Sequence, residues 1–272
     1  EVVIVNTTSM REPSMASGPP MVALARGEHL LRPLLDRFER EPGATFASRR
    51  EGDHFADVTV KDVVEMVRKL AGGFVASGVA PGDRVALMSH TRLEWMILDH
   101  AILAAGAVTV PIYDTSSPDQ VRWIISDSEA VIAVVETTAM ADVVEALRTD
   151  LPLCRDVLTI DAGALDELES RAVTVDDAVI DQRIADLDVD SIATIIYTSG
   201  TTGRPKGCTL THGNLRANVA QALDALGPEL RPGDTGLLFL PLAHALTKGN
   251  ALFGAEADIT IGFASDIAHL VD

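Results

Sequence analysis

The polar segment from Tyr197 to Gly207 has the composition of a loop that binds phosphate. Glycines let its backbone turn tightly and approach a ligand, hydroxyl side chains add hydrogen-bond donors, and a lysine supplies a mobile positive charge for the outermost phosphate. The glycines are Gly200, Gly203 and Gly207, the hydroxyl residues are Thr198, Ser199, Thr201 and Thr202, and the lysine is Lys206. This combination predicts a site for the phosphates of a nucleotide.

The order of these residues argues against a P-loop nucleoside triphosphatase. In that class Gly-Lys-Ser/Thr follows the first glycine at a fixed distance, whereas here Lys206 precedes Gly207. Two non-enzymatic interpretations stay open. The segment could be a solvated Gly/Ser/Thr connection without a ligand, or part of a naturally short, non-catalytic nucleotide-binding module.

His244 is a second candidate, because it follows a predicted strand and the turn Pro241-Leu242-Ala243. Side chains in that position lie at the carboxyl edge of an open parallel sheet, where ligands bind. A lone histidine is, however, more often a structural residue.

Apolar periodicity predicts strands and helices that alternate along the chain. Thr59 and Thr211 are expected to cap helices, and Gly78 to end one. Helices are expected near residues 30–38, 59–78, 92–105, 118–128, 138–147, 215–226 and 245–254, with another opening at 265. Strands are expected near 84–88, 130–135, 156–160, 192–197, 235–240 and 259–263, with a further strand within 103–113 and a hairpin within 45–60. This alternation predicts an α/β fold: a doubly wound, mostly parallel sheet with helices on both faces.

Charge and composition limit the classes of partner and the cellular location that we expect. The 272 residues include 40 acidic and 22 basic side chains, a net charge of −18, which argues against nucleic acid or an anionic membrane as a partner. Nucleotides must then be held locally, by loop amides, Arg204 and Lys206. Cys154 and Cys208 have neither metal-ligand spacing nor the pattern of a disulfide framework. No run of membrane-spanning length and no secretory signal is visible, so we expect a cytoplasmic protein.

The ends of the chain and one internal segment differ from the alternating pattern. Residues 1–27 have few large apolar side chains and are expected to form a loosely ordered leader. Residues 161–190 hold ten acidic side chains against Arg171 and Arg183, which predicts a solvated, partly helical surface excursion.

Three segments resemble motifs of the acyl-adenylate-forming (AMP-binding) superfamily, which includes acyl- and aryl-CoA ligases, peptide-synthetase adenylation domains and beetle luciferases. Residues 197–207 resemble its phosphate loop almost letter for letter. Residues 239–244, Phe-Leu-Pro-Leu-Ala-His, resemble the next motif, and residues 103–113 resemble a more widely shared structural element. The resemblance covers roughly Leu30 to Asp272 and implies the N-terminal portion of such an enzyme.

The resemblance also implies a reaction. A carboxylate attacks the α-phosphate of ATP to give an acyl-adenylate and pyrophosphate, and the thiol of coenzyme A then displaces AMP. Residues 198–203 would hold the β- and γ-phosphates, and Lys206 would neutralise the leaving pyrophosphate. Mg²⁺ would bridge phosphate oxygens, with Thr198 as its protein contact. His244 would border the carboxylate substrate, which makes Lys206 and His244 the candidate catalytic residues.

Within the superfamily the chain looks like bacterial long-chain fatty-acyl-CoA ligases, on the evidence of Glu94-Trp95 and of residues 113–117 and 209–212. The substrates would be a fatty acid, ATP and coenzyme A, and a homo-oligomer is compatible with this class. Fatty-acyl-AMP and aryl-acid ligases are alternatives. Lys248 is a departure, because some long-chain enzymes carry an aromatic gate just beyond the motif histidine.

Later motifs of the superfamily find no match. These are the motifs for the adenine contact, the metal glutamate, the ribose aspartate and the hinge, and the mobile C-terminal domain is absent as well. We therefore expect residues 28–272 to form a partial N-terminal domain that does not complete the reaction alone.

Overall fold

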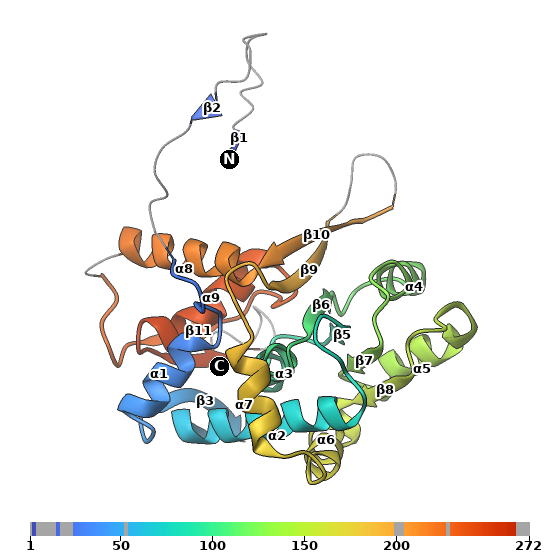
Figure 1. Cartoon of the computed structure of the whole chain (residues 1–272), viewed down its shortest axis with the longest axis horizontal. Coiled ribbons are helices and arrows are strands. Elements are labelled where there is room, and N and C mark those ends of the chain that lie inside the picture. Colours follow the sequence, from blue (N-terminus) through green and yellow to red (C-terminus); the bar gives the residue numbers. More distant parts are fainter. Residues whose placement is uncertain are drawn as a thin grey trace.

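The computed structural model describes residues 24–51, 54–198, 204–226 and 229–264, together with 2–3 and 15–16. Most of these residues lie in two β-sheets and in the helices that cover them (Figure 1). A further strand pair joins β1 (Val2–Val3) to β2 (Met15–Ala16). Most of the expected leader, the tip of the expected hairpin at 52–53 and the helix expected from Ser265 lie outside the described residues.

The larger sheet has six strands, and all its neighbouring strands are parallel except one antiparallel pair at its edge. Its order is β10 (Lys206–Thr211), β9 (Ile192–Thr198), β6 (Val108–Ile112), β5 (Arg84–Met88), β7 (Ile132–Val135) and β8 (Asp156–Thr159). The antiparallel pair is β10 with β9.

Helices cover both faces of this sheet, which confirms the predicted fold class. Side chains alternate between the two faces of a strand, so Val85 and Leu87 of β5 belong to one apolar core while Ala86 and Met88 belong to another. The first core is shared with α2 (Val60–Ala76) and α3 (Leu93–Ala104), and the second with α4 (Pro118–Asp127) and α5 (Thr138–Ala146).

A second, four-stranded sheet combines segments that are distant in the sequence. Its order is β11 (Thr235–Leu238), β12 (Thr260–Phe263), β3 (Thr45–Glu51) and β4 (His54–Thr59). The hairpin of β3 and β4 is antiparallel, as expected, and the other two pairs are parallel. The core beside it also takes in residues of α1 (Arg32–Arg40), α8 (His212–Leu226) and α9 (Ala245–Glu256).

The acidic segment 161–190 forms two helices, α6 (Ala164–Ala172) and α7 (Asp177–Ala185), with short 3₁₀ turns upstream at Arg148–Asp150 and Ile160–Ala162. One side of this pair is packed. Leu168, Ile180 and Ile184 are buried, and α6 lies so close to α2 that a Cβ on Gly73 would come within 2.3 Å of the Leu168 carbonyl oxygen. Glycine is required there because the two backbones nearly touch.

Local signals placed most elements correctly. Thr59 caps α2 in a reciprocal capping box with Asp62, and Thr211 and Asn214 exchange the equivalent hydrogen bonds at the start of α8. The principal difference is the strand β10 (Lys206–Thr211), because no strand is predicted between the phosphate loop and the helix near 215–226. Within the described residues, no helix combines the length and apolarity needed to cross a membrane.

Candidate nucleotide-binding site

The predicted phosphate loop is carried by the hairpin of β9 and β10. Thr198, the last residue of β9, stands opposite Lys206, the first residue of β10, and both side chains are exposed. The structure therefore brings these two site residues together at the mouth of the loop. Ser199, Gly200, Thr201, Thr202 and Gly203 lie outside the described residues, so their predicted role in holding phosphate stays a prediction.

Gly207 fits the returning strand closely against the outgoing one. A Cβ at this position would lie 2.8 Å from Cγ2 of Ile195 and 3.2 Å from Cζ of Tyr197. Contacts that short force a neighbour to move, so the glycine is needed for close packing. It thereby sets the backbone position of the adjacent Lys206.

Helix α4 contacts both limbs of the hairpin. The Tyr197 hydroxyl donates a hydrogen bond of 2.7 Å to the Asp127 carboxylate, and Nε1 of Trp123 donates one of 2.8 Å to the carbonyl oxygen of Pro205. The guanidinium of Arg204 lies over the Trp123 ring, 4.7 Å from its centroid. Burial, and next the hydrogen bond to Asp127, raise the pKa of Tyr197 above its usual value, so this donor stays protonated.

Sequence reasoning missed Trp123 as a site residue. The sequence indicates this role only weakly, because a tryptophan in an amphipathic helix is usually a packing residue. Only the pairing across 82 residues to Pro205 shows that its indole N–H reaches the loop.

His244 lies at the end of the second sheet, after β11 and the Pro241-Leu242-Ala243 turn, and its side chain is exposed. The turn is fixed to the first sheet, because the hydroxyl of Thr91, beyond β5, donates a hydrogen bond of 2.7 Å to the Leu240 carbonyl. His244 immediately precedes α9, and its carbonyl accepts a hydrogen bond of 2.9 Å from the Lys248 backbone N–H. Thr198 and Lys206 thus belong to the first sheet and His244 follows a strand of the second, and the hydrogen bond of Thr91 connects the two sheets.

Lys248, the departure noted from the sequence, is not at the surface. It is 1% exposed, its ammonium lies 2.5 Å from Oδ1 of Asp99 on α3, and it also sits 5.5 Å from the centroid of the Trp95 ring. Trp95 is itself buried in the core. Lys248 therefore takes part in an internal ion pair.

Two further histidines, His90 and His212, have opposite surroundings. His90 is 45% exposed and lies between Asp114, at 3.2 Å, and Glu136, at 2.9 Å. Burial lowers its pKa, but the hydrogen bond to Glu136 and the two carboxylate charges outweigh burial and raise it. His212 is fully buried, and burial lowers its pKa to about 3. Its Nδ1 accepts a hydrogen bond of 3.1 Å from the Leu30 backbone N–H.

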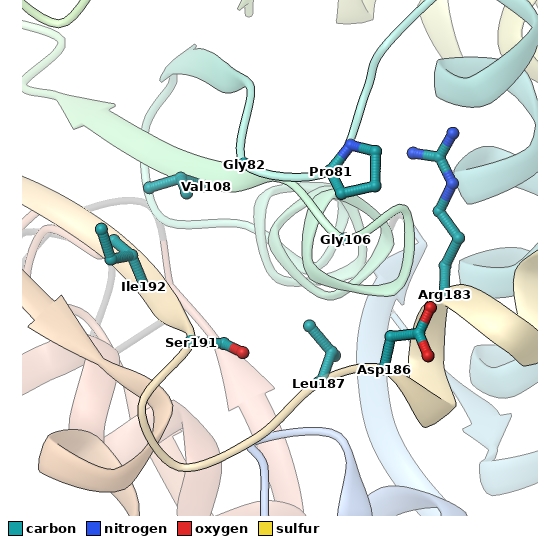
Figure 2. Close-up of a pocket in the computed structure, with 9 residues that line it drawn as sticks. All are labelled: Pro81, Gly82, Gly106, Val108, Arg183, Asp186, Leu187, Ser191 and Ile192. Carbon is teal, nitrogen blue, oxygen red and sulfur yellow. The ribbon is translucent and has the colours of Figure 1, made fainter.

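A partly open, mainly apolar pocket of about 270 Å³ lies elsewhere, and Figure 2 shows the residues that line it. Val108 and Ile192 are the first residues of β6 and β9, so the pocket opens at the amino edge of the sheet, opposite to the phosphate loop. The Arg183 guanidinium donates to the carbonyls of Val79 and Ala105. Ligands of open parallel sheets bind at the carboxyl edge, so this pocket is not the nucleotide site.

Comparisons with known proteins agree with the motif assignment. Residues 35–269 match the model of the AMP-binding enzyme family. The chain is 46% identical over 220 residues to the long-chain-fatty-acid–CoA ligase FadD15 of Mycobacterium bovis, covering 80% of this chain and 37% of that protein. It is 34% identical over 218 residues to the peroxisomal long chain acyl-CoA synthetase 7 of Arabidopsis thaliana, covering 75% of this chain and 30% of that protein.

A solved structure of an N-terminal domain has a similar fold. An inhibitor-bound N-terminal domain of FACL13 from Mycobacterium tuberculosis superposes with a TM-score of 0.75 at 26% identity, covering 88% of this chain and 58% of that one. The chain therefore spans 37% of the length of FadD15 and 58% of the solved domain.

Proposed function

Because this chain belongs to the AMP-binding enzyme family, we propose that it carries the phosphate-binding part of a long-chain fatty-acid–CoA ligase. In the first step an oxygen of the fatty carboxylate attacks the α-phosphorus of ATP, and the bond to the β-phosphate breaks to release pyrophosphate. In the second step the thiol of coenzyme A attacks the acyl carbon, and AMP leaves. The activity is proposed for the longer protein, since the chain spans 37% of FadD15.

One observation carries the proposal: Lys206 and Thr198 face each other where the hairpin opens into the loop. A lysine ammonium at this point would neutralise the charge that develops on pyrophosphate, while the hydroxyl of Thr198 and the residues 199–203 would bind the β- and γ-phosphates. Charge stabilisation and positioning supply most of the catalysis in phosphoryl-type transfer. In a chain of net charge −18, local cations are needed to hold a nucleotide.

Mg²⁺ belongs to the proposal as a companion of ATP. Magnesium prefers oxygen ligands and usually keeps several waters. Thr198 offers one exposed hydroxyl, and within the described residues no group of three His, Cys, Asp or Glu side chains could hold a metal ion. Thr198 would therefore supply one protein oxygen to Mg²⁺, and the ion would offset part of the charge of the phosphates.

His244 is proposed to border the fatty carboxylate. Its exposure at the end of the second sheet and the fixation of its turn by Thr91 support this role. A cytoplasmic location completes the proposal, and the two cysteines, which are free thiols, agree with it.

The test is pyrophosphate exchange into ATP by the full-length enzyme, measured with a panel of carboxylic acids. We expect exchange to depend on long-chain fatty acids, and AMP release to require coenzyme A. Lys206→Ala should lower exchange about 100-fold or more, a loss of the size seen for preorganised charge stabilisation. Lys61→Ala is the matched control, because Lys61 is an exposed lysine on α2.

Different results would point to a different function. AMP formation that ignores coenzyme A would indicate a fatty-acyl-AMP ligase, and a preference for aromatic acids would indicate an aryl-acid ligase. Nucleotide binding without any acid-dependent exchange would favour a non-catalytic module. Full exchange by Lys206→Ala would contradict the role proposed for the loop.

A further inference from the structure

We infer that Trp123 is a positioning residue for the phosphate loop, and that Arg204 acts through Trp123 and does not bind phosphate itself. The inference rests on the proposed function and deepens it. It concerns the returning limb of the loop, residues 204–206, which leads directly into Lys206.

The first observation is the hydrogen bond from Nε1 of Trp123 to the carbonyl oxygen of Pro205, at 2.8 Å. Pro205 immediately precedes Lys206, so this bond fixes the peptide that carries the lysine. Proline restricts its own φ and the conformation of the residue before it, so little backbone freedom remains between Arg204 and Lys206. An indole N–H is a donor only, and a partly buried one needs such an acceptor.

The second observation is the position of the Arg204 side chain. Its guanidinium lies 4.7 Å from the centroid of the Trp123 ring, within the range of a cation–π contact. The same indole thus holds the limb twice, by its N–H at Pro205 and by its face at Arg204. The Arg204 guanidinium is thus directed toward helix α4, and Lys206 is the residue that neutralises the phosphate charge.

The third observation is that α4 is itself fixed to the outgoing strand. Tyr197 donates to Asp127, the last residue of α4, at 2.7 Å. On the other side of the helix, Val121 and Ile125 are buried in the second apolar core. Helix α4 therefore forms a rigid support, and Trp123 transmits the position of that support to the peptide before Lys206.

The experiment uses the full-length enzyme with Trp123→Phe, Trp123→Leu, Arg204→Met and the double variant Trp123→Leu/Arg204→Met. Phenylalanine keeps a ring for Arg204 but loses the N–H, whereas leucine loses both contacts. Arg122→Met is the matched control, because Arg122 lies on the same helix and pairs with the largely exposed Asp119. The KM for ATP and for fatty acid, and kcat, are measured by acid-dependent pyrophosphate exchange.

A second measurement needs no catalysis. Trypsin cleaves after Lys206, while the bond between Arg204 and Pro205 resists it, so the rate of cutting at Lys206 in the absence of nucleotide reports how firmly the limb is held. Thermal unfolding of each variant shows whether it is folded. If Trp123→Leu does not fold, Trp123→Phe gives the answer for the hydrogen bond.

We expect Trp123→Leu and Arg204→Met each to raise the KM for ATP by roughly three- to tenfold and to speed cleavage at Lys206, with the KM for fatty acid unchanged. The double variant should be little worse than Trp123→Leu alone, because that change already removes the ring that Arg204 contacts. Trp123→Phe should have a smaller effect, and Arg122→Met none.

Two results would overturn the inference. If the effects of Trp123→Leu and Arg204→Met on the KM for ATP multiply, Arg204 contacts the nucleotide independently. If Trp123→Leu leaves both the KM and the cleavage rate unchanged, the indole does not position the loop. Should the parent enzyme show no acid-dependent exchange, the proposed function fails, yet the cleavage rates still decide whether Trp123 and Arg204 hold the limb together.

Discussion

The ammonium of Lys248 lies 2.5 Å from the carboxylate of Asp99, and both side chains are almost completely shielded from solvent. Lys248 belongs to α9 beside the second sheet and Asp99 to α3 against the first, so the ion pair connects the two halves of the structure. Buried charges of this kind are costly to leave unpaired. The pair also lies one helical turn after His244, which makes its integrity relevant to the site.

Removing one partner of this pair should destabilise the fold strongly. We expect Lys248→Met to lower the free energy of unfolding by about 3–5 kcal/mol, because Asp99 would be left as an uncompensated buried charge. The double change Lys248→Met/Asp99→Leu should recover most of that loss. Urea unfolding measures the free energy of unfolding of the single and the double variant. Lys61→Met, which breaks an exposed pair with Glu65, should cost less than about 1 kcal/mol, and an equally small cost for Lys248→Met would contradict the prediction.

Enlarging Gly207 should damage the hairpin. Gly207→Val places a Cβ 2.8 Å from Ile195 Cγ2, and we expect a loss of about 1–3 kcal/mol in the free energy of unfolding from the forced shift. Exchange activity should fall as well, because Lys206 is the adjacent residue. Gly43→Ala is the control: a Cβ there meets nothing within 4 Å, so its stability should be unchanged or slightly raised. A stable, fully active Gly207→Val would refute the close-packing argument.

The buried His212 should make stability fall in acid. Its pKa is about 3 in the folded protein, against an ordinary value of 6.5, so the unfolded chain binds more protons between these values. The free energy of unfolding should therefore be unaffected above pH 7.5 and decrease as the pH falls below 6.5, by at most about 1.4 kcal/mol per pH unit from this group. His212→Gln, which keeps an acceptor for Leu30, should show a flatter profile between pH 7.5 and 5.5.

His90 supplies a control of opposite sign for this profile. Its pKa is raised in the folded state, so its contribution to stability is present below pH 6.5 and is lost as the pH rises through the folded value. His90→Gln should consequently remove the gain in stability that accompanies a fall in pH toward 6.5, and leave the slope below pH 6.5, which His212→Gln reduces, unchanged. Identical profiles for the parent protein and His212→Gln would show that the buried imidazole is not kept neutral.

The hydrogen bond from Thr91 to Leu240 should support the His244 turn. Thr91→Val removes the hydroxyl with little change in shape, and we expect a loss of about 1 kcal/mol in the free energy of unfolding and a raised KM for fatty acid, with the KM for ATP unchanged. Thr247→Val is a matched control, because the buried hydroxyl of Thr247 has no partner within the described residues. That variant should be neutral or stabilising, and equal losses in the two variants would rule out a specific role for Thr91.

Elements with strong local signals were predicted from the sequence. Strand β5 has the predicted bounds, Arg84–Met88, and the caps at Thr59 and Thr211 depend only on residues within one helical turn. Strand β10 was missed because only Cys208 and Leu210 among its six residues are apolar, which is too short an alternation to predict a strand; its strand conformation comes from antiparallel pairing with β9. The domain boundaries and the roles of residues 199–203 stay predictions.

The sequence by itself determined the chemistry of the loop, the alternation of strands and helices, and the family, since these depend on residue types in contiguous segments. Tertiary structure alone decided the second sheet, in which β12 pairs with β3, and the partners of Trp123 and Lys248. The physical reason is distance along the chain. Asp99 and Lys248 are 149 residues apart, and no local propensity encodes a contact that exists only after both helices have packed against the sheets.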